Sequence, residues 1–394
     1  MNYEFPHITH IDQVRAAIAG RKEFIEAERD DYIVFNYIVN MGDTFPEIET
    51  VDHAILRECR GLIFDKDGNV LSRRLHKFFN VNETSETRLE NVDLSKPHVI
   101  LEKLDGSMIT PIKIGDHYRW GTKMGITEVA MNAEAFVAKH PQYEKFARAC
   151  YYCGLTPIFE WCSRKNQIVI DYPEDRLVLI AMRVMESGEY VNYERLCENG
   201  KYYGIEVVKQ YPGTVSSMEH LVQETRDLKD AEGWIIRFDD GHMLKIKADD
   251  YVMMHRAKDM IRIEKNVLLV VAEDKADDLL PILNEVDRND LIQYRKAVDQ
   301  SIAEKADVVA HGLIQGRDMD RKTFAVTLVP NFDQSIHSIM FALYDQRHSN
   351  FDDLVLKARE LIVEKIRKSC GTIVGVNKVR WIIGNVRWKD QNDE

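Results

Sequence analysis

Cysteine, long apolar runs and an excess of positive charge are all scarce in this sequence. Six cysteines among 394 residues are too few for a disulfide framework, and they suit a reducing compartment. No uninterrupted apolar run reaches the length of about 18 residues that a transmembrane helix needs. The first residues mix polar, acidic and apolar side chains, without the apolar core of a signal peptide. We therefore expect a cytoplasmic protein that has no membrane partner.

The charge balance excludes binding of nucleic acid through overall charge. Lysine and arginine number 53 against 65 aspartates and glutamates, which leaves a net charge of −12. A local basic cluster must therefore hold any anionic ligand against the mean field of the chain. With 45% hydrophobic residues the chain can build a sizeable core, and its length suggests two or three domains.

Familiar motifs for metal and phosphate binding are also missing. Cys150 and Cys153 form one CxxC motif, but no second CxxC and no HxxxH follows to complete a zinc site. We interpret this pair as two small apolar residues at a helix end. The sequence has neither GxxxxGK[ST] nor GxGxxG after a strand. A bound nucleotide would therefore not lie on a glycine loop at a helix N-terminus.

The hydrophobic pattern changes near residue 250. Before it, alternating or β-branched runs separated by tight-turn signals predict antiparallel strands. These strands are expected at 31–39, 61–65, 98–104, 108–114, 156–161, 167–172, 176–182, 233–238 and 242–247, with helices at 10–19, 128–152 and 193–200. After it, helical spacing of apolar residues predicts helices at 251–274, 276–307, 334–347 and 351–369. The stretch 372–388 is more typical of a short hairpin or a loosely packed tail.

The fold class predicted by this pattern is α+β. A domain of antiparallel sheets with flanking helices is expected over 1–250, and a mainly helical, all-α domain over 251–394.

A lysine before a tight turn is the first candidate for chemistry. Lys103 ends an apolar strand in KLDGS (103–107), one residue before an Asp-Gly turn. Taken alone, this motif favours an ordinary hairpin with a solvent-facing lysine. Four further residues change the interpretation: Glu160 in a strand, Glu232 at the head of another, and Lys245 and Lys247 two apart on one strand face.

The order of these motifs resembles that of the covalent nucleotidyltransferases, which include polynucleotide ligases and mRNA capping enzymes. ECRG (58–61) and KFFN (77–80) before KLDGS, and EGWII followed by KIK after it, are similar to the phage-type RNA ligase 1 family. DRKTFA (320–325) and SIMFALY (338–344) resemble that family's C-terminal domain. The resemblance spans roughly residues 20–370, and we find no counterpart for the tail after it.

The resemblance implies a three-step reaction that uses ATP and Mg²⁺ or Mn²⁺. A lysine takes AMP from ATP, passes it to an RNA 5′-phosphate, and a 3′-hydroxyl then seals the two ends. The implied substrates are single-stranded RNA breaks or a nicked tRNA anticodon loop, repaired in the host cytoplasm if the protein comes from a phage. The helical domain is expected to select structured RNA, and the protein is expected to be a monomer.

Residue roles follow from the same resemblance. Lys103 is the expected nucleophile, with Lys245, Lys247 and Glu160 as further catalytic residues. Nucleotide contacts are expected from Tyr37, Arg60, Lys77, Phe79, Glu102 and Lys123, together with the catalytic residues. Glu232 is the first candidate for metal binding, and Asp277 and Asp278 match an acidic pair of the family. For that pair a solvated helix face explains the sequence equally well, and for Phe79 a core position does.

Elementary electrostatics supports the lysine assignments. A free lysine has a pKa of about 10.4, so only about one in a thousand is neutral near pH 7.4. Two ammonium groups within about 5 Å could each lower the cost of removing the proton by roughly 3 kcal/mol at an effective dielectric near 20. We expect Lys245 and Lys247 to supply that charge to Lys103 and to neutralise the α-phosphate.

Other functions stay open at this point. A DNA ligase, a GTP-using capping enzyme, and a catalytically silent RNA-end-binding protein could share these motifs. The helical pattern after KIK argues against the first two, because they would continue into a strand-rich domain. One departure from the family lies after Glu160, where Arg164 and Gln167 stand in place of a proline and an arginine. Arg164 is the candidate to replace the missing cationic contact.

Overall fold

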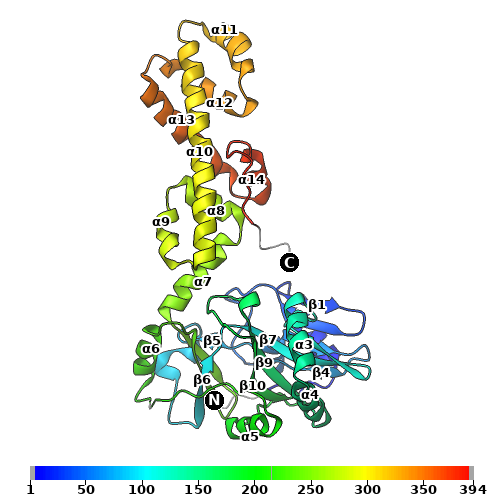
Figure 1. The fold of residues 1–394 in the computed structure, drawn as a ribbon. Helices are drawn as coiled ribbons and strands as arrows, with labels where there is room; N and C mark the ends of the chain where they lie inside the picture. Colours follow the sequence, from blue (N-terminus) through cyan, green and yellow to red (C-terminus); the bar gives the residue numbers. More distant parts are fainter. Residues whose placement is uncertain (1–4, 214, 390–394) are drawn as a thin grey trace. The chain divides into compact units, whose positions relative to one another are not determined.

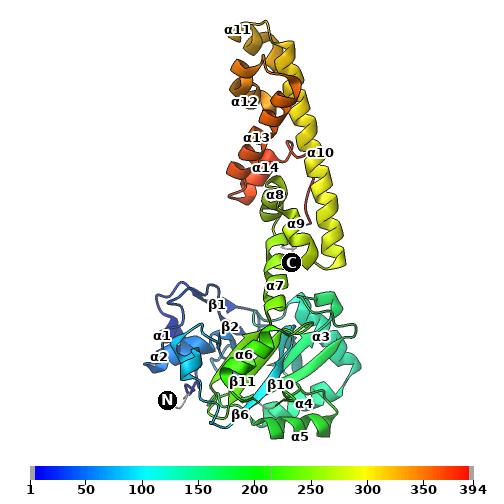
Figure 2. The same cartoon turned by 90° about the vertical axis from the view of Figure 1, so that its left-hand side faces the viewer.

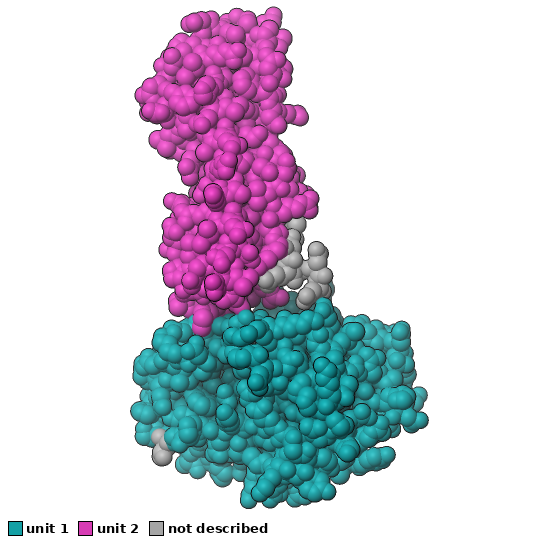
Figure 3. Space-filling model, viewed as in Figure 1, with its two compact units in different colours: residues 1–252 teal, residues 253–394 magenta. Residues whose placement is uncertain are grey.

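The computed structural model describes residues 5–213 and 215–389, which divide into two compact units at residues 252 and 253. Figure 3 shows the two units in different colours. The first unit contains all the described strands and six complete helices, and the second is helical. The fold class is thus confirmed as α+β. Among the described residues, no helix is both long and apolar enough to cross a membrane.

Three four-stranded sheets form the first unit (Figure 1). The first has the order β1 (Phe24–Glu28), β2 (Ile33–Tyr37), β3 (Arg60–Phe64) and β4 (Val70–Ser72). The second has the order β10 (Arg176–Val184), β9 (Leu155–Cys162), β7 (Ser107–Ile114) and β8 (His117–Gly121). The third has the order β5 (Phe79–Asn80), β12 (Met243–Lys247), β11 (Gly233–Phe238) and β6 (His98–Lys103). All strand pairs are antiparallel except β12 with β5.

Each sheet is covered by its own helices. The first sheet packs against α1 (Ile11–Ile18) and α2 (Val51–Glu58), whose apolar residues share a core with Phe35 and Phe64. The second packs against α3 (Glu128–Lys139), α4 (Gln142–Tyr152) and α5 (Tyr193–Tyr203), and the third against α6 (Met218–Arg226). The other face of the first sheet is also apolar, and its Val34 and Ile63 share a core with Ile112 of β7 in the second sheet.

The KLDGS turn does not close a hairpin. Lys103 ends β6 in the third sheet, whereas Ser107 begins β7 in the second sheet. The hairpin interpretation of this motif is therefore wrong, because the chain leaves one sheet and enters another at the turn.

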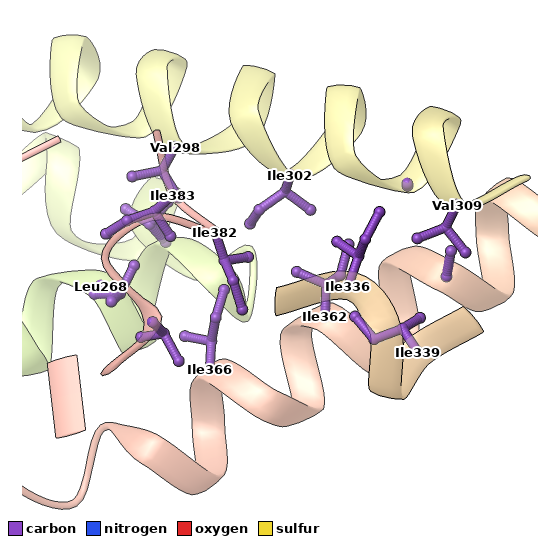
Figure 4. Packing of buried hydrophobic residues seen from close by; sticks show 14 of the residues in the cluster. Leu268, Val298, Ile302, Val309, Ile336, Ile339, Ile362, Ile366, Ile382 and Ile383 are labelled. Atoms are coloured by element: carbon purple, nitrogen blue, oxygen red, sulfur yellow. The ribbon is translucent and has the colours of Figure 1, made fainter. Parts of the chain in front are cut away.

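The second unit is built around one long helix. α7 (Asp249–Ile261) crosses the division between the units, followed by α8 (Glu264–Ala272), α9 (Ala276–Leu279), α10 (Glu285–Gln315), α11 (Arg321–Thr323), α12 (Gln334–Leu343), α13 (Phe351–Ser369) and α14 (Ile373–Val379). Figure 2 shows α12 and α13 along α10. The aliphatic side chains between them form a single continuous core, part of which is drawn in Figure 4.

Five local predictions differ from the structure. The stretch 251–274 is divided between α7 and α8, and 276–307 contains α9, a 3₁₀ turn and most of α10. The stretch 372–388 contains α14 and buries Ile382, Ile383 and Trp388, because the tail fills the core of the second unit rather than standing apart from it. The stretch 167–172 forms no strand; a short 3₁₀ helix precedes it and a buried aspartate then holds its backbone. The predicted helix 128–152 is two helices, because Pro141 follows the end of α3.

Candidate functional site

The register of the third sheet brings the two ends of the motif series together. Gly233 at the start of β11 pairs with Lys103 on β6 and with Lys247 on β12. Residues directly opposite each other in an antiparallel pair point to the same face, so both lysines lie on one face with Lys245, two residues before Lys247. Gly233 has no side chain to fill the space between them, and a Cβ there would lie 2.0 Å from the backbone oxygen of Ile246.

Glu232 occupies the position between the two lysines. Its Oε1 lies 2.6 Å from Lys103 Nζ and 3.0 Å from Lys247 Nζ, and the carboxylate is buried. The expectation that Lys103 is surrounded by positive charge alone is therefore incomplete. One carboxylate fixes both amines in place.

Asp105, which sequence analysis left without a role, anchors the turn after Lys103. Its Oδ2 accepts hydrogen bonds of 2.7 Å from the backbone N–H groups of Val169 and Ile170. Its Oδ1 accepts a hydrogen bond of 2.6 Å from the hydroxyl of Tyr251, a buried residue in the first turn of α7. An acidic residue after an apolar strand is a turn signal in the sequence, but only the fold shows that it is buried.

Gly106 permits close packing of the same turn against β9. A Cβ at this position would lie 2.4 Å from the backbone oxygen of Trp161 and 3.0 Å from Cγ of Glu160. The turn after Lys103 therefore lies directly against the end of the strand that carries Glu160. Contact between these two motifs, which are more than fifty residues apart in sequence, requires a glycine here.

Glu160 lies in a site that favours its neutral form. Burial raises the pKa of this carboxyl to about 7, although Lys103 and Arg60 act in the opposite direction. The negative charge of Glu232 adds to the increase. A carboxyl group that titrates near neutral pH beside an amine is suited to exchange hydrogen bonds with an incoming ligand.

Lys245 is the most strongly perturbed lysine of the site. Burial lowers its pKa to about 7, and the positive charges of Lys77, Arg60 and Lys103 lower it further. These cations come from three different parts of the chain, so their combined repulsion arises only in the folded state. The like charges around Lys245 favour the binding of an anion here.

Lys77 stands among aromatic rings. Its Nζ lies 4.8 Å from the ring centre of Phe79, 5.6 Å from that of Phe45 and 5.7 Å from that of Tyr37. Burial lowers the pKa of Lys77. The Nζ of Lys123 lies 5.4 Å from the other predicted contact, the ring of Tyr37. The ring faces attract both cations and hold them without neutralising their charge.

Phe79 supports this group from the core. Its ring is 4% exposed and packs between Lys77 and Arg57, at an angle to Phe45. Of the two interpretations open for this residue, the structure places it in the core.

Arg60 is half-buried at the start of β3. Among the described residues, no carboxylate lies within ion-pair distance of it, and its Nη1 contacts the sulfur of Met108 at 3.7 Å. By contrast, the neighbouring Glu58 is fully engaged with Arg73 and Arg183, which are both inaccessible to solvent. The ECRG motif thus contains one buried structural acid and one guanidinium that remains open to a ligand.

Several predicted residues are not part of this cluster. Glu102 precedes Lys103 on β6 and therefore faces the opposite side of the sheet; its backbone N–H donates to Lys209. Arg164 forms a two-pronged ion pair with Asp171, at 2.6 and 2.7 Å. Cys150 is buried in α4, whereas Cys153 is exposed just after it.

The acidic pair of the second unit is engaged by an arginine. Asp277 accepts from Arg295 at 2.7 Å, and the same guanidinium contacts Asp274 at 2.7 Å. Asp278 is exposed. Within the described ranges, no group of three or more histidine, cysteine or acidic side chains is arranged to hold a metal ion.

Comparison with known proteins assigns the chain to a family. The model of a family described as RNA ligase, of the phage type, matches residues 58–258, which is half of the chain and includes Lys103, Glu160, Glu232 and both lysines of KIK. The chain therefore belongs to the phage-type RNA ligase family.

Two relatives and one solved structure illustrate the likeness. The chain is 31% identical over 255 residues to a "Putative RNA ligase" of Thermovibrio ammonificans, covering 63% of this chain and 64% of that protein. It is 26% identical over 295 residues to RNA ligase 1 of bacteriophage TS2126, covering 72% and 70%. The structure of an archaeal ATP-dependent RNA ligase aligns with 64% of each chain, with a TM-score of 0.42 and 14% identity. The chain thus spans slightly less than two thirds of the Thermovibrio protein.

Proposed function

We propose that this protein is an ATP-dependent RNA ligase that joins a 5′-phosphate to a 3′-hydroxyl. The observation that carries the proposal is the position of the Lys103 amine. It lies 2.6 Å from the buried Glu232, and on a sheet face with two further lysines. Family membership adds the reaction class, and the site offers the groups that this reaction needs.

The first step would form a covalent bond between the protein and AMP. Nζ of Lys103, freed of a proton and of its ion pair with Glu232, attacks the α-phosphorus of ATP. A nitrogen–phosphorus bond forms, the bond to the pyrophosphate oxygen breaks, and pyrophosphate leaves. Lys247 and Lys245 lie on the same face and would neutralise the charge on the phosphate and the leaving group.

The charges of the site fit a triphosphate and a divalent cation. Arg60, Lys77 and Lys123 are cations without a carboxylate partner among the described side chains, and they suit phosphate oxygens. Glu232 and Glu160 are the carboxylates nearest to Lys103 and would hold Mg²⁺ or Mn²⁺ together with phosphate oxygens. Such an ion neutralises phosphate charge when bound.

The next two steps would act on RNA. AMP passes from Lys103 to the 5′-phosphate of an RNA strand, which forms a phosphoanhydride and releases the lysine. A 3′-hydroxyl then attacks that activated phosphate, which forms the phosphodiester and releases AMP. We further propose single-strand breaks in structured RNA, including a nicked tRNA anticodon loop, as substrates, with the helical residues 253–394 contributing to their selection.

The first experiment tests the covalent intermediate. The purified full-length protein is incubated with Mg²⁺ and α-labelled ATP or GTP and then resolved on a denaturing gel. We expect label from ATP in the wild type and in Lys66→Ala, which removes an exposed lysine, but none in Lys103→Ala. Preferential labelling by GTP would indicate a capping enzyme. If neither nucleotide labels the wild type, the enzymatic proposal is wrong and RNA-end binding alone remains.

A second experiment separates RNA from DNA and linear from nicked substrates. Sealing of 5′-phosphorylated RNA strands, nicked stem-loops and nicked duplexes is compared with that of the matching DNA strands. We expect RNA to be sealed and DNA ends to react poorly. Faster sealing of a nicked stem-loop than of a linear strand would support repair of structured RNA, whereas equal rates would contradict it.

A further inference from the structure

Five of the sixteen tyrosines gather on one side of the first unit, away from the lysine cluster. They are Tyr118 of β8, Tyr151 and Tyr152 of α4, and Tyr202 and Tyr203 of α5, which we call the tyrosine face. Both ribbon views place α4 and α5 next to each other at one end of this unit (Figures 1 and 2). The Tyr152 ring is 86% exposed and that of Tyr202 is 83% exposed. Rings this large and this exposed lose favourable burial energy unless a ligand covers them.

The rings form a row of two contact groups, one between Tyr118 and Tyr151 and one among Tyr202, Tyr203 and Phe146. Tyr118 and Tyr151 meet edge to face with their centres 6.0 Å apart. On α5, Tyr202 and Tyr203 meet in the same way at 4.9 Å, and Tyr203 contacts Phe146 of α4 at 5.0 Å. The C-terminal part of α4 therefore links the hairpin of β7 and β8 to α5.

Two cations already lie on the ring faces of this row. Nζ of Lys113 is 4.8 Å from the ring centre of Tyr151, and the guanidinium of Arg148 is 5.0 Å from that of Tyr118. Among the described residues, Lys113 has no carboxylate within ion-pair distance, whereas Arg148 shares its charge with Glu144 at 2.8 Å. Lys201 is exposed next to Tyr202. In a chain with a net charge of −12, the tyrosine face thus repeats the combination of cations and aromatic rings that surrounds Lys77.

We propose that the tyrosine face binds single-stranded RNA outside the adenylylation site. Exposed rings offer stacking surfaces for unpaired bases, and cations beside the rings meet the phosphates between those bases. The cationic contacts favour a polyanion over an apolar protein surface. The proposal rests on the proposed function, because it assigns a path to the RNA strand of that reaction.

The tyrosine face would contact RNA beyond the nucleotides that react. β9 begins at Leu155, directly after the turn that ends α4, and reaches Glu160 five residues later. At about 3.3 Å per residue, the two ends of this segment are roughly 17 Å apart. A short oligonucleotide held at Lys103 would not reach the tyrosine face, whereas a longer strand could contact both.

The test compares RNA strands of two lengths. Binding of fluorescent single strands of about 3 and about 20 nucleotides to the full-length protein is measured by anisotropy, with the double variant Tyr152→Ala/Tyr202→Ala. We expect the double variant to bind the longer strand about tenfold more weakly than the wild type does, which is the effect of losing one stacked base. Its affinity for the shorter strand should be unchanged. Both substituted rings are exposed, so the variant should fold normally.

Two matched variants identify the interaction. Tyr152→Phe/Tyr202→Phe keeps the rings and should bind as the wild type does, because stacking does not need the hydroxyl. Met131→Ala removes another exposed side chain of the same unit, on α3, and should also have no effect. Lys113→Gln should reduce the dependence of log Kd on log salt by about 0.7, the value for one phosphate contact on a single strand.

The outcomes separate this inference from the function it rests on. All these variants should label themselves with AMP as the wild type does. If the wild type is labelled and binds RNA, but the alanine variant binds both strands unchanged, the tyrosine face is not an RNA site and the ligase proposal stands. Equal weakening of both strand lengths would also contradict the inference. Failure of the wild type to take up AMP would instead overturn the proposed function.

Discussion

The two units of this chain bury different kinds of side chain. Among the described residues, the first buries ten acidic or basic side chains, namely Arg57, Glu58, Arg73, Arg74, His76, Lys77, Asp105, Arg183, Glu232 and Arg237. The described part of the second buries two, Glu264 and Asp287, in a core that is mainly aliphatic and aromatic. Burying a charge is unfavourable unless it is paired. A unit that buries many charges therefore has a lower free energy of unfolding than it would have with an apolar core, but it holds these charges in fixed positions. The proposed chemistry uses residues of the first unit.

A closer comparison of the two buried glutamates sharpens this difference. Glu58 lies between two arginines and connects α2 to β10. Glu264 pairs with Arg380 and also accepts the backbone N–H of Trp388, so it holds the end of the described chain in the helical core. Both pairs join distant parts of the sequence. Among the described residues, the first unit buries further charges near Lys103, such as Lys77 and Glu232.

The largest expected effect follows from removing the charge of Glu58. Glu58→Gln leaves the guanidinium groups of Arg73 and Arg183 buried without a carboxylate, at a cost of about 4 kcal/mol in the free energy of unfolding. Urea unfolding monitored by hydrogen exchange should show this loss within residues 5–252 only. Glu28→Gln, which breaks an exposed pair with Lys66, is the control and should cost less than about 1 kcal/mol. Equal losses in the two variants would contradict the comparison.

In the second unit, we expect a cavity in the core to lower the free energy of unfolding more than the loss of a charge does. Ile362→Ala removes a fully buried side chain between α13 and α10 and should cost about 3 kcal/mol, with faster exchange confined to residues 253–389. Leu356→Ala, at an exposed position on the same helix, should have little effect. Self-labelling with ATP should persist in both. Loss of labelling in Ile362→Ala alone would show that the chemistry depends on the helical core.

The pKa of Lys245 predicts a pH-dependent stability. Folding lowers this pKa from 10.5 to about 7, so the unfolded state binds more protons between these values and stability must rise with pH across that window. Lys245→Met removes the buried charge. It should stabilise the ligand-free protein by about 2 kcal/mol more at pH 6.5 than at pH 9.5, less than the full shift implies because the amine is partly exposed.

Urea titrations of both proteins at the two pH values measure this difference. Lys113→Met, at a half-buried lysine outside the cluster, is the control. A stabilisation that is equal at both pH values would mean that folding does not lower the pKa of Lys245.

The smallest effect concerns the ion pairs of Asp277. Arg295→Gln removes the ion pairs of this guanidinium with Asp274, Asp277 and Asp299 and should change the free energy of unfolding by less than about 1 kcal/mol. Arg367→Gln, which breaks another exposed pair in this unit, provides the comparison. A loss above about 2 kcal/mol for Arg295→Gln would show that electrostatics supports this unit as well.

Much of the architecture could be predicted from local patterns. Eight of the nine predicted strands exist because alternating side chains suit a sheet with one buried face. The failure at 167–172 has a tertiary cause, since Asp105 takes backbone N–H groups that a strand would have used. The failure at 372–388 has another: Trp388 donates to the backbone oxygen of Ile261, a partner more than a hundred residues away. Neither contact leaves a local signal.

Some features of the candidate site could likewise be predicted from the sequence, and others could not. Spacing alone predicts that Lys245 and Lys247 share a face, and family resemblance singles out Lys103, Glu160 and Glu232. The ion pair of Glu232 with two lysines, and the anchoring of Asp105 by Tyr251, were not predicted. Residue type cannot reveal which buried acid pairs with which base when the partners come from separate strands.

The amino-acid sequence by itself determined the type of most strands and helices, because a side-chain period of two or of 3.6 residues suits only one of them. It also determined that any anion must be bound by a few lysines and arginines of an acidic chain. Tertiary structure alone decided that Lys103 and Lys247 lie on either side of Gly233 with Glu232 between them. The register between distant strands is set by how whole sheets and helices pack, and not by the residues that the register brings together.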